Sequence, residues 1–158
     1  FCANNQEENR YFVNAHISER ALREIYLKGF EIAVKESQPL SIMTSYNLLN
    51  GIHTANQYDL CQKALRDEWD FQGVVMTDWF TSQNVPGMTG KYKNKYPISA
   101  STGCIAAGND LQMPGCQKNI DDIVDSVNNG KEIDGYKITK GDLQFCTYNL
   151  LKVILKIM

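Results

Sequence analysis

The stretch Val74-Val75-Met76-Thr77-Asp78-Trp79 decides which fold we predict for this chain of 158 residues. Its apolar run follows Gly73 and ends abruptly in a carboxylate, which is typical of a buried strand in a parallel sheet. Burying an unpaired polar or charged group costs roughly 2–7 kcal/mol or more. We therefore expect Asp78 to lie where the strand opens onto a polar cleft, as catalytic residues do in barrels. An aspartate that caps the following turn is the alternative interpretation.

Two other segments have the same character and recur at nearly constant spacing. Residues 40–46 form a short apolar strand that ends in polar residues, and residues 109–115 form another. The three strands begin near residues 41, 74 and 109, so they are 33 and 35 residues apart. A strand, a loop and a helix that recur at about 30 or more residues predict βαβ units in a parallel sheet. We therefore assign the chain to the α/β class.

Helical patterns separate and follow these strands. We expect helices from Ser18 to before Pro39, from Asn56 to about 70, over about 99–107, around 120–127 and from Thr139 onward. Ser18 is the predicted N-cap of the first helix, and Asn56 and Thr139 each have an aspartate three residues later, a variant of the capping box. The first helix is expected to bury one face made of Leu22, Ile25, Tyr26, Gly29, Ala33 and Val34.

Three strand–helix units cannot close a barrel. A complete eightfold barrel takes about 250 residues, with a lower limit near 200. The chain is therefore either a small open sheet or the last part of a larger barrel. The irregular, asparagine-rich residues 1–16 and the absence of a Met at position 1 favour the second alternative.

Composition excludes several classes of protein. The net charge of -2 argues against a nucleic-acid partner, and no apolar run approaches the length of a membrane span. The five cysteines have no CxxC spacing and the two histidines are too few for a metal cage, so we predict no cofactor. Free thiols favour a reducing compartment such as the cytoplasm.

Four motifs in this order and spacing resemble the catalytic barrel of glycoside hydrolase family 3. They are FCANNQEENR (1–10), SIMTSYNLLNG (41–51), LRDEWDFQGVVMTDW (65–79) and AAGNDLQMPG (106–115). The resemblance is to the β-glucosidase branch and covers essentially the whole chain. It implies a partial (β/α)8 barrel of TIM type, with the last three parallel strands and their helices. Residues 1–158 are then the C-terminal portion of the catalytic domain, without the second, α/β sandwich domain.

The same resemblance implies the site residues and the reaction. Asp78 of the TDW motif matches the family's nucleophile, and its glycone-binding residues match Arg10, Met43, Tyr46 and Trp79. The implied activity is release of terminal β-D-glucosyl or similar residues from a β-glucoside or short oligosaccharide by a retaining mechanism. The family's general acid/base, a glutamate on the second domain, is absent here, as is a Lys-His pair that precedes the position of Phe1. We therefore expect the chain alone to be inactive.

The chemistry of these side chains agrees with such roles, although each has an ordinary structural alternative. A retaining glycosidase needs a carboxylate that attacks the sugar. Trp79 offers a flat face for a sugar ring or is a core aromatic. Arg10 binds hydroxyls with its planar fork or makes a surface ion pair. Tyr46 donates to the nucleophile or anchors the strand end, and Met43 packs in the wall.

Neighbouring features receive other interpretations. We expect Asp110, which also ends a strand, to be structural. A loop with lysines and tyrosines at residues 91–96 is a candidate wall of the aglycone site.

Two other classes of function were considered, and one of them remains as an alternative. The chain is either an enzyme part or a non-catalytic carbohydrate-binding or structural remnant of such a barrel, and the intact TDW favours the enzyme. An aspartyl-phosphate enzyme needs an Asp-x-Asp pattern and a phosphate loop, which the sequence lacks. The sugar, its linkage and the oligomeric state stay open.

Overall fold

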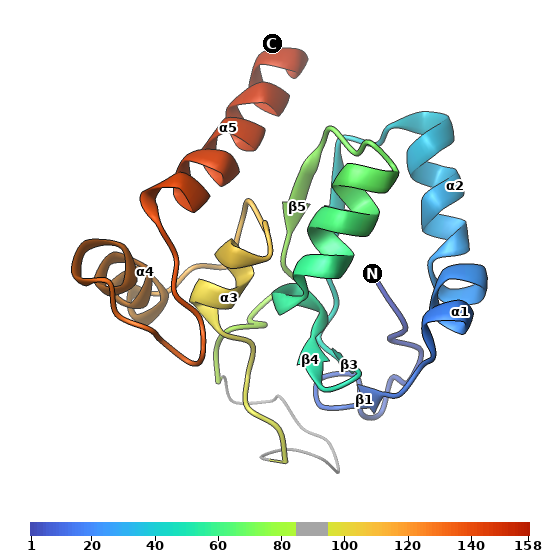
Figure 1. Cartoon of the computed structure of the whole chain (residues 1–158), viewed down its shortest axis with the longest axis horizontal. Helices are drawn as coiled ribbons and strands as arrows, with labels where there is room; N and C mark the ends of the chain where they lie inside the picture. Colours follow the sequence, from blue (N-terminus) through green and yellow to red (C-terminus); the bar gives the residue numbers. More distant parts are fainter. Residues whose placement is uncertain (85–94) are drawn as a thin grey trace.

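The computed structural model describes residues 1–84 and 95–158, and its centre is a pair of parallel strands. Strand β2 (Ser41–Met43) lies beside β5 (Val74–Met76), with Ser41 opposite Val74 and Met43 opposite Met76 (Figure 1). Leu111 adds a single parallel bridge to Met76 on the other side of β5. The α/β class and the predicted strands near residues 41 and 74 are therefore confirmed.

The third predicted strand is only a bridge, and the side chain of Asp110 explains why. The Val75 amide donates to the Oδ2 atom of Asp110 at 2.7 Å, where a regular ladder would supply a backbone carbonyl. The neighbouring backbone bonds are present, since Asp110 N donates to Val75 O and Thr77 N donates to Leu111 O. A carboxylate has thus replaced one backbone acceptor of the ladder.

Helices flank the strands on both sides. Their bounds are α1 Glu19–Ala21, the π-helical η1 Leu22–Tyr26, α2 Lys28–Ser37, the 3-10 turn η2 Thr54–Asn56, the π-helical η3 Asp59–Glu68, α3 Ser101–Ala106, α4 Gln117–Asn129 and α5 Lys140–Ile157. In Figure 1, α1 and α2 lie to one side of β5, and α3, α4 and α5 lie to the other. Among the helices of residues 1–84 and 95–158, none is long and apolar enough to cross a membrane.

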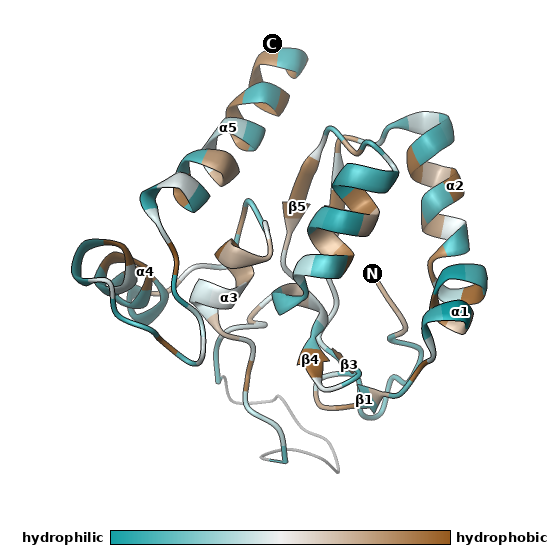
Figure 2. Ribbon diagram, in the orientation of Figure 1, coloured by the Kyte–Doolittle hydropathy of each residue, from teal (hydrophilic) through white to brown (hydrophobic). Residues whose placement is uncertain are grey.

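The main core lies between the strands and the helices η1, α2 and η3. Leu60, Cys61, Ala64, Leu65 and Trp69, which lie on η3 and at its end, are all buried in this core together with Val75. Many apolar residues of these helices, coloured brown in Figure 2, lie toward the strands, whereas Ile25 and Ile32 are exposed. The helices pack on the face of the strand pair that carries Ile42 and Val75. Because side chains alternate along a strand, Met43 and Met76 lie on the opposite face.

The predicted face of the first helix is partly wrong. Leu22 and Val34 are buried as expected, but Ile25 is 68% exposed and Leu27 takes its place in the core. The reason is the π-helical segment η1, where Leu27 N donates to Leu22 O, five residues back. Such a turn advances the chain by more than 3.6 residues and rotates the buried face.

Helix ends follow most of the predicted signals. Ser18 caps α1, and Thr139 with Asp142 forms a reciprocal capping box on α5. Gly130 ends α4 in the left-handed conformation that glycine adopts without strain. The prediction for Asn56 is wrong: its side chain accepts from Ala100 N at 3.0 Å and donates to Ala100 O at 2.9 Å. The side-chain amide of Asn56, which would have capped the second helix, instead bonds to the backbone at the start of α3.

A second, small sheet supports the loop after β2. It has the order β1 (Asn14–Ala15), β3 (Leu48–Leu49) and β4 (Ile52–His53), with β1 parallel and β4 antiparallel to β3. The sequence did not predict it, because strands of two residues have no periodicity to detect. The sheet joins the segment after Arg10 to the segment after Tyr46.

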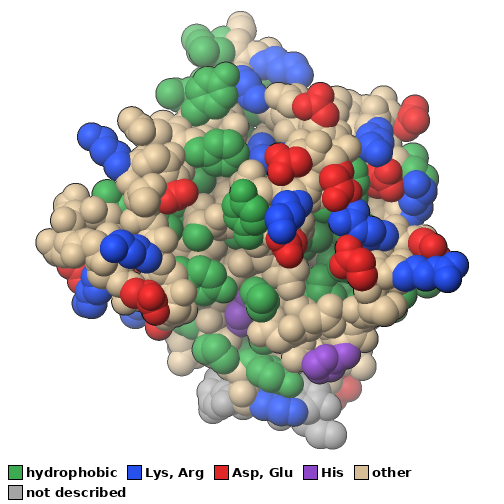
Figure 3. All heavy atoms as spheres, in the orientation of Figure 1, with side chains coloured by type: hydrophobic (Ala, Val, Ile, Leu, Met, Phe, Trp, Pro, Cys, Tyr) green, Lys and Arg blue, Asp and Glu red, His purple; other side chains and the backbone are tan. Residues whose placement is uncertain are grey.

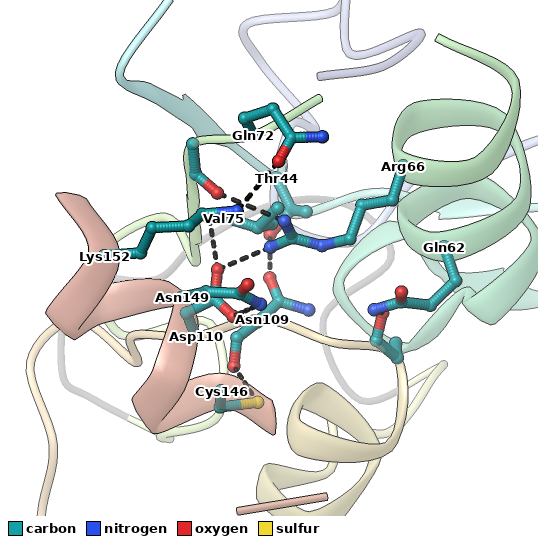
Figure 4. A network of polar contacts seen from close by, with 12 residues as sticks. Thr44, Gln62, Arg66, Gln72, Val75, Asn109, Asp110, Cys146, Asn149 and Lys152 are labelled. Atoms are coloured by element: carbon teal, nitrogen blue, oxygen red, sulfur yellow. Dashed lines mark hydrogen bonds and ion pairs between the residues drawn. The ribbon is translucent and has the colours of Figure 1, made fainter. Parts of the chain in front are cut away.

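A buried polar network connects η3, β5 and α5 (Figure 4). Arg66 Nη2 lies 2.6 Å from Asp110 Oδ2, and their side chains are 8% and 0% exposed. Asn149 of α5 donates to Asp110 Oδ1 at 2.9 Å. Burial raises the pKa of Asp110, and the donors Arg66, Val75 N–H and Asn149 oppose that rise. Asp110 is therefore structural, as expected.

Replacing Asp110 tests this network. We expect Asp110→Ala to lower the free energy of unfolding by about 3–5 kcal/mol, because it leaves the Arg66 charge buried without a partner. The matched control is Asp125→Ala, which removes an exposed pair with Lys131 at 2.9 Å and should cost less than about 1 kcal/mol. Urea unfolding of the full-length protein that contains these residues, followed by tryptophan fluorescence, measures both, and equal losses in the two variants would contradict the assignment.

Candidate active site

Polar side chains gather where the two parallel strands end. Because β2 and β5 are parallel and in register, the segments that follow Met43 and Met76 leave the sheet at the same edge. This brings the Tyr46 hydroxyl next to the Asp78 carboxylate. Two residues separated by 32 positions in the sequence thus meet through the register of the strands.

The backbone around Asp78 is held on both sides. Its Oδ1 atom accepts from Trp79 N at 2.7 Å. The preceding Thr77 is fully buried, and its hydroxyl oxygen accepts from Met113 N at 2.9 Å. Asp78 itself is only partly buried, so its carboxylate stays accessible on a rigid support.

Trp79 lies beside the carboxylate and is 52% exposed, so the alternative of a core aromatic does not apply. Its ring meets the Phe80 ring edge-on, with 5.8 Å between the centroids. Phe80 has a φ of 64°, in the left-handed region that larger side chains rarely adopt, and its N–H donates to Met113 O at 2.7 Å. This turn holds the indole at the surface, next to Asp78.

Arg10 joins the site through Tyr11, which the sequence reasoning missed. Arg10 Nη2 donates to the Tyr11 hydroxyl at 2.8 Å, and the guanidinium carbon lies 5.7 Å from the centroid of the Tyr46 ring. The Tyr11 ring meets the Tyr46 ring edge-on at 4.6 Å. Arg10 also pairs with Glu7 at 3.3 Å, so the alternative of a surface ion pair is present as well. The signal in the sequence was an aromatic directly after the Arg that closes the first motif.

Electrostatics keep Tyr46 in its neutral form. Burial raises the pKa of its hydroxyl far above the usual value, the neighbouring Asp78 adds to the rise, and Arg10 opposes it. A neutral hydroxyl can donate to a carboxylate throughout the physiological pH range. The Tyr46 hydroxyl is therefore available as a hydrogen-bond donor beside Asp78.

Met43 is the predicted site residue that lies farthest from this cluster along the strands. It pairs with Met76, two residues before Asp78, so both methionines face the same side of the sheet as Asp78. Its side chain is 44% exposed, because β2 is an edge strand in the described part of the chain. Met43 thus lines the open face below the carboxylate.

His53 contacts the backbone of Tyr46 and was not predicted as a site residue. Its Nδ1 atom lies 3.0 Å from the carbonyl oxygen of Tyr46, and its Nε2 atom lies 2.7 Å from that of Pro97. Burial lowers the pKa of this imidazole. The ring connects the backbone of Tyr46 to the chain that follows residues 85–94.

Two further predictions concern the loop at residues 91–96 and the absence of a metal site. Most of the loop at residues 91–96, the candidate aglycone wall, lies outside the described residues. Within residues 1–84 and 95–158, no group of three His, Cys, Asp or Glu side chains is arranged to hold a metal ion.

Comparison with known proteins decides the family. Residues 4–140 match the model of the glycosyl hydrolase family 3 N-terminal domain. The chain belongs to this family. It is 40% identical over 157 residues to a β-glucosidase of Ruminococcus albus, and the matched segment covers 98% of this chain and 15% of that enzyme. The family 3 resemblance is therefore confirmed.

A solved structure and a second relative extend the comparison. The structure of β-glucosidase 3B from Thermotoga neapolitana in complex with glucose matches with a TM-score of 0.80 and 40% identity, over 98% of this chain and 20% of that one. An exo-α-(1->6)-L-arabinopyranosidase of Bifidobacterium breve is 57% identical over 79 residues, half of this chain and 10% of that enzyme. The chain thus spans about a fifth or less of the length of these proteins.

The pH dependence of stability tests the environment of His53. Since its folded pKa lies below the ordinary value near 6.5, the unfolded state takes up the proton first as the pH falls. The free energy of unfolding should therefore decrease as the pH falls below about 6.5, and the decrease should stop below the folded pKa.

Two histidine variants isolate this contribution. In His53→Gln, the part of the pH dependence that His53 contributes should disappear. The control His16→Gln changes an exposed imidazole and should leave it intact. Urea unfolding of the full-length protein that contains these residues, at pH 5.0 to 7.5, measures the difference, and a His53→Gln variant with the wild-type slope would contradict the burial of a neutral ring.

Proposed function

We propose that residues 1–158 are part of a retaining β-glycosidase in which Asp78 is the nucleophile. One observation carries this proposal: the partly exposed Asp78 carboxylate, at the end of a parallel strand, lies next to the buried Tyr46 hydroxyl and the exposed Trp79 indole. A non-catalytic remnant has no need to keep a donor and an accessible carboxylate together. Arg10, Met43, Tyr46 and Trp79 are the proposed glycone-binding residues.

The proposed reaction is a double displacement. An Asp78 oxygen attacks the anomeric carbon, and the bond to the leaving-group oxygen breaks with its electron pair on that oxygen. A general acid from outside this chain, which the family resemblance gives as a glutamate, supplies the proton. Water then attacks the anomeric carbon of the glycosyl-enzyme and gives one proton to the residue that acted as the acid, while Asp78 leaves as a carboxylate and the sugar is released with retained β configuration.

Each site residue has a separable part in this chemistry. The Tyr46 hydroxyl orients the carboxylate and stabilises its charge, which must be available for attack. The Trp79 indole provides an apolar face on which a sugar ring stacks. Arg10 offers a planar set of donors to adjacent sugar hydroxyls.

We further propose that the chain supplies the last three strand–helix units of a (β/α)8 catalytic barrel. Two features of the described residues support this arrangement. The strand face with Ser41 and Met43 is exposed, although the opposite face packs on the helices. Helix α5 exposes a row of apolar side chains, seen at the top of Figure 3, which includes Tyr148, Leu151, Ile154, Leu155 and Ile157. The other barrel strands and a second domain would cover these surfaces.

The proposed substrate is a β-D-glucoside or a short oligosaccharide with a terminal β-D-glucosyl residue. The β-glucosidases of Ruminococcus albus and Thermotoga neapolitana, which match nearly the whole chain, support this choice. The arabinopyranosidase of Bifidobacterium breve makes an aryl α-L-arabinopyranoside the second substrate to assay.

Removal of the nucleophile is the first test. In the complete protein that contains these residues, Asp78→Asn should lower kcat at least about 10³-fold, because an amide cannot form the glycosyl-enzyme. The matched control is Asp67→Asn, an exposed aspartate of η3, which should keep wild-type turnover of an aryl β-glucoside. Turnover that survives in Asp78→Asn would exclude Asp78 as the nucleophile.

The chain as given provides a second test. Residues 1–158 alone should hydrolyse an aryl β-glucoside too slowly for useful turnover, because general acid help is worth roughly 10²–10⁴ in rate and its donor lies elsewhere. The uncovered strand face and α5 should also give a loosely packed state with poor solubility. A cooperative monomeric melt together with ordinary turnover would show that the partial-barrel proposal is wrong.

A further inference from the structure

Tyr11 stands between two proposed substrate-binding residues and contacts both. Its hydroxyl accepts from Arg10 Nη2 at 2.8 Å, and the Arg10 guanidinium carbon lies 4.8 Å from the centroid of its ring. The same ring meets the Tyr46 ring edge-on, at 4.6 Å and with 60° between the planes. Tyr11 therefore constrains the Arg10 guanidinium through its hydroxyl and the Tyr46 side chain through its ring.

The contacts of Tyr11 belong to a larger aromatic cluster. Phe12 and Tyr46 form the buried part of this cluster, and Tyr11 and Phe80 pack against it. Phe80 belongs to the turn that carries Trp79, and the Tyr46 hydroxyl reaches Asp78. The cluster thus joins the Arg10 segment, the end of β2 and the end of β5 at one place.

A flexible arginine needs such a partner to be useful in binding. An Arg side chain loses rotamer entropy when a substrate immobilises it, and this loss opposes binding. A hydrogen bond from the guanidinium to the Tyr11 hydroxyl restricts these rotamers before the sugar arrives. An edge-to-face contact similarly restricts the rotation of the Tyr46 ring.

We infer that Tyr11 is a positioning residue for the glycone site, which orients Arg10 through its hydroxyl and Tyr46 through its ring. This inference rests on the proposed function, because Arg10 and Tyr46 have their binding roles only there. Tyr11 touches neither the reacting carbon nor Asp78 in this scheme. It acts on the carboxylate only through Tyr46.

The two contacts can be separated by two substitutions in the complete protein. Tyr11→Phe keeps the ring and removes the acceptor for Arg10, so it should raise KM for an aryl β-glucoside about 2- to 10-fold with little change in kcat. Tyr11→Leu also removes the edge-to-face contact and should lower kcat about 3- to 10-fold further. Tyr58→Phe and Tyr58→Leu, at an exposed tyrosine before η3, should leave both constants unchanged.

A pH profile and a double-mutant cycle distinguish positioning from mere packing. In Tyr11→Leu, the acid limb of kcat/KM should move to higher pH, because a carboxylate with a weakened donor takes up a proton more readily. In a Tyr46→Phe background, where the donor is already absent, Tyr11→Leu should no longer move that limb. Full additivity of the two substitutions in kcat would overturn the inference.

The outcomes separate this inference from the proposed function. Wild-type KM in Tyr11→Phe, with an unchanged acid limb in Tyr11→Leu, overturns the role of Tyr11 while Asp78→Asn remains inactive. Loss of the proposed function appears instead as undiminished turnover in Asp78→Asn. Since Tyr11→Phe preserves the packed ring, its KM decides the hydroxyl contact even where Tyr11→Leu melts at a lower temperature.

Discussion

The buried ion pair between Arg66 and Asp110 is the interaction on which the rest of the structure depends. Asp110 receives donors from three elements: Arg66 of η3 at 2.6 Å, the Val75 amide of β5 at 2.7 Å and Asn149 of α5 at 2.9 Å. The rings of Phe71 and Phe145 lie on the guanidinium, with centroids 5.6 and 5.5 Å away. A buried pair with these supports is costly to break, although an apolar replacement of both partners can be neutral. Its value here is that it fixes the position of β5.

Because β5 is fixed at Val75, the carboxylate of Asp78, three residues farther along the chain, is positioned as well. The adjacent Asn109 donates to Ala55 O at 2.7 Å and accepts from the Thr44 hydroxyl at 3.0 Å, so β2 and η2 are tied to the same point. The register of β2 and β5 then places Tyr46 next to Asp78, so the position of these two residues is determined by strand pairing. This arrangement meets the requirement that a reactive group be held by packed neighbours more than by its own loop.

The sequence predicted those parts of the fold that local patterns determine. Val74–Asp78 was recognised as a strand that opens on a polar edge, and Ser18 and Thr139 as caps, because propensity and position are local properties. Asn56 failed as a cap because its amide bonds to Ala100, 44 residues away. The first helix turned its buried face at a π-helical segment, which no 3.6-residue period can reveal.

The same distinction applies to the site. Asp78, Arg10, Met43, Tyr46 and Trp79 were named from family motifs, and the fold brings all but Met43 into one polar and aromatic group. Tyr11 and His53 were missed, since their contacts with Tyr46 span 35 and 7 residues and depend on packing in three dimensions. The sequence shows only that an aromatic residue follows Arg10, and it contains no signal for the contacts themselves.

Covalent labelling of the complete protein tests the central claim most directly. A 2-fluoro-β-glucoside with a good leaving group slows deglycosylation and traps the glycosyl-enzyme. After trypsin digestion, the added sugar mass should appear on the peptide of residues 67–91, and fragmentation should place it on Asp78 instead of Asp67, Glu68 or Asp70. A label on one of those three carboxylates, or on a peptide that lacks residue 78, would contradict the account.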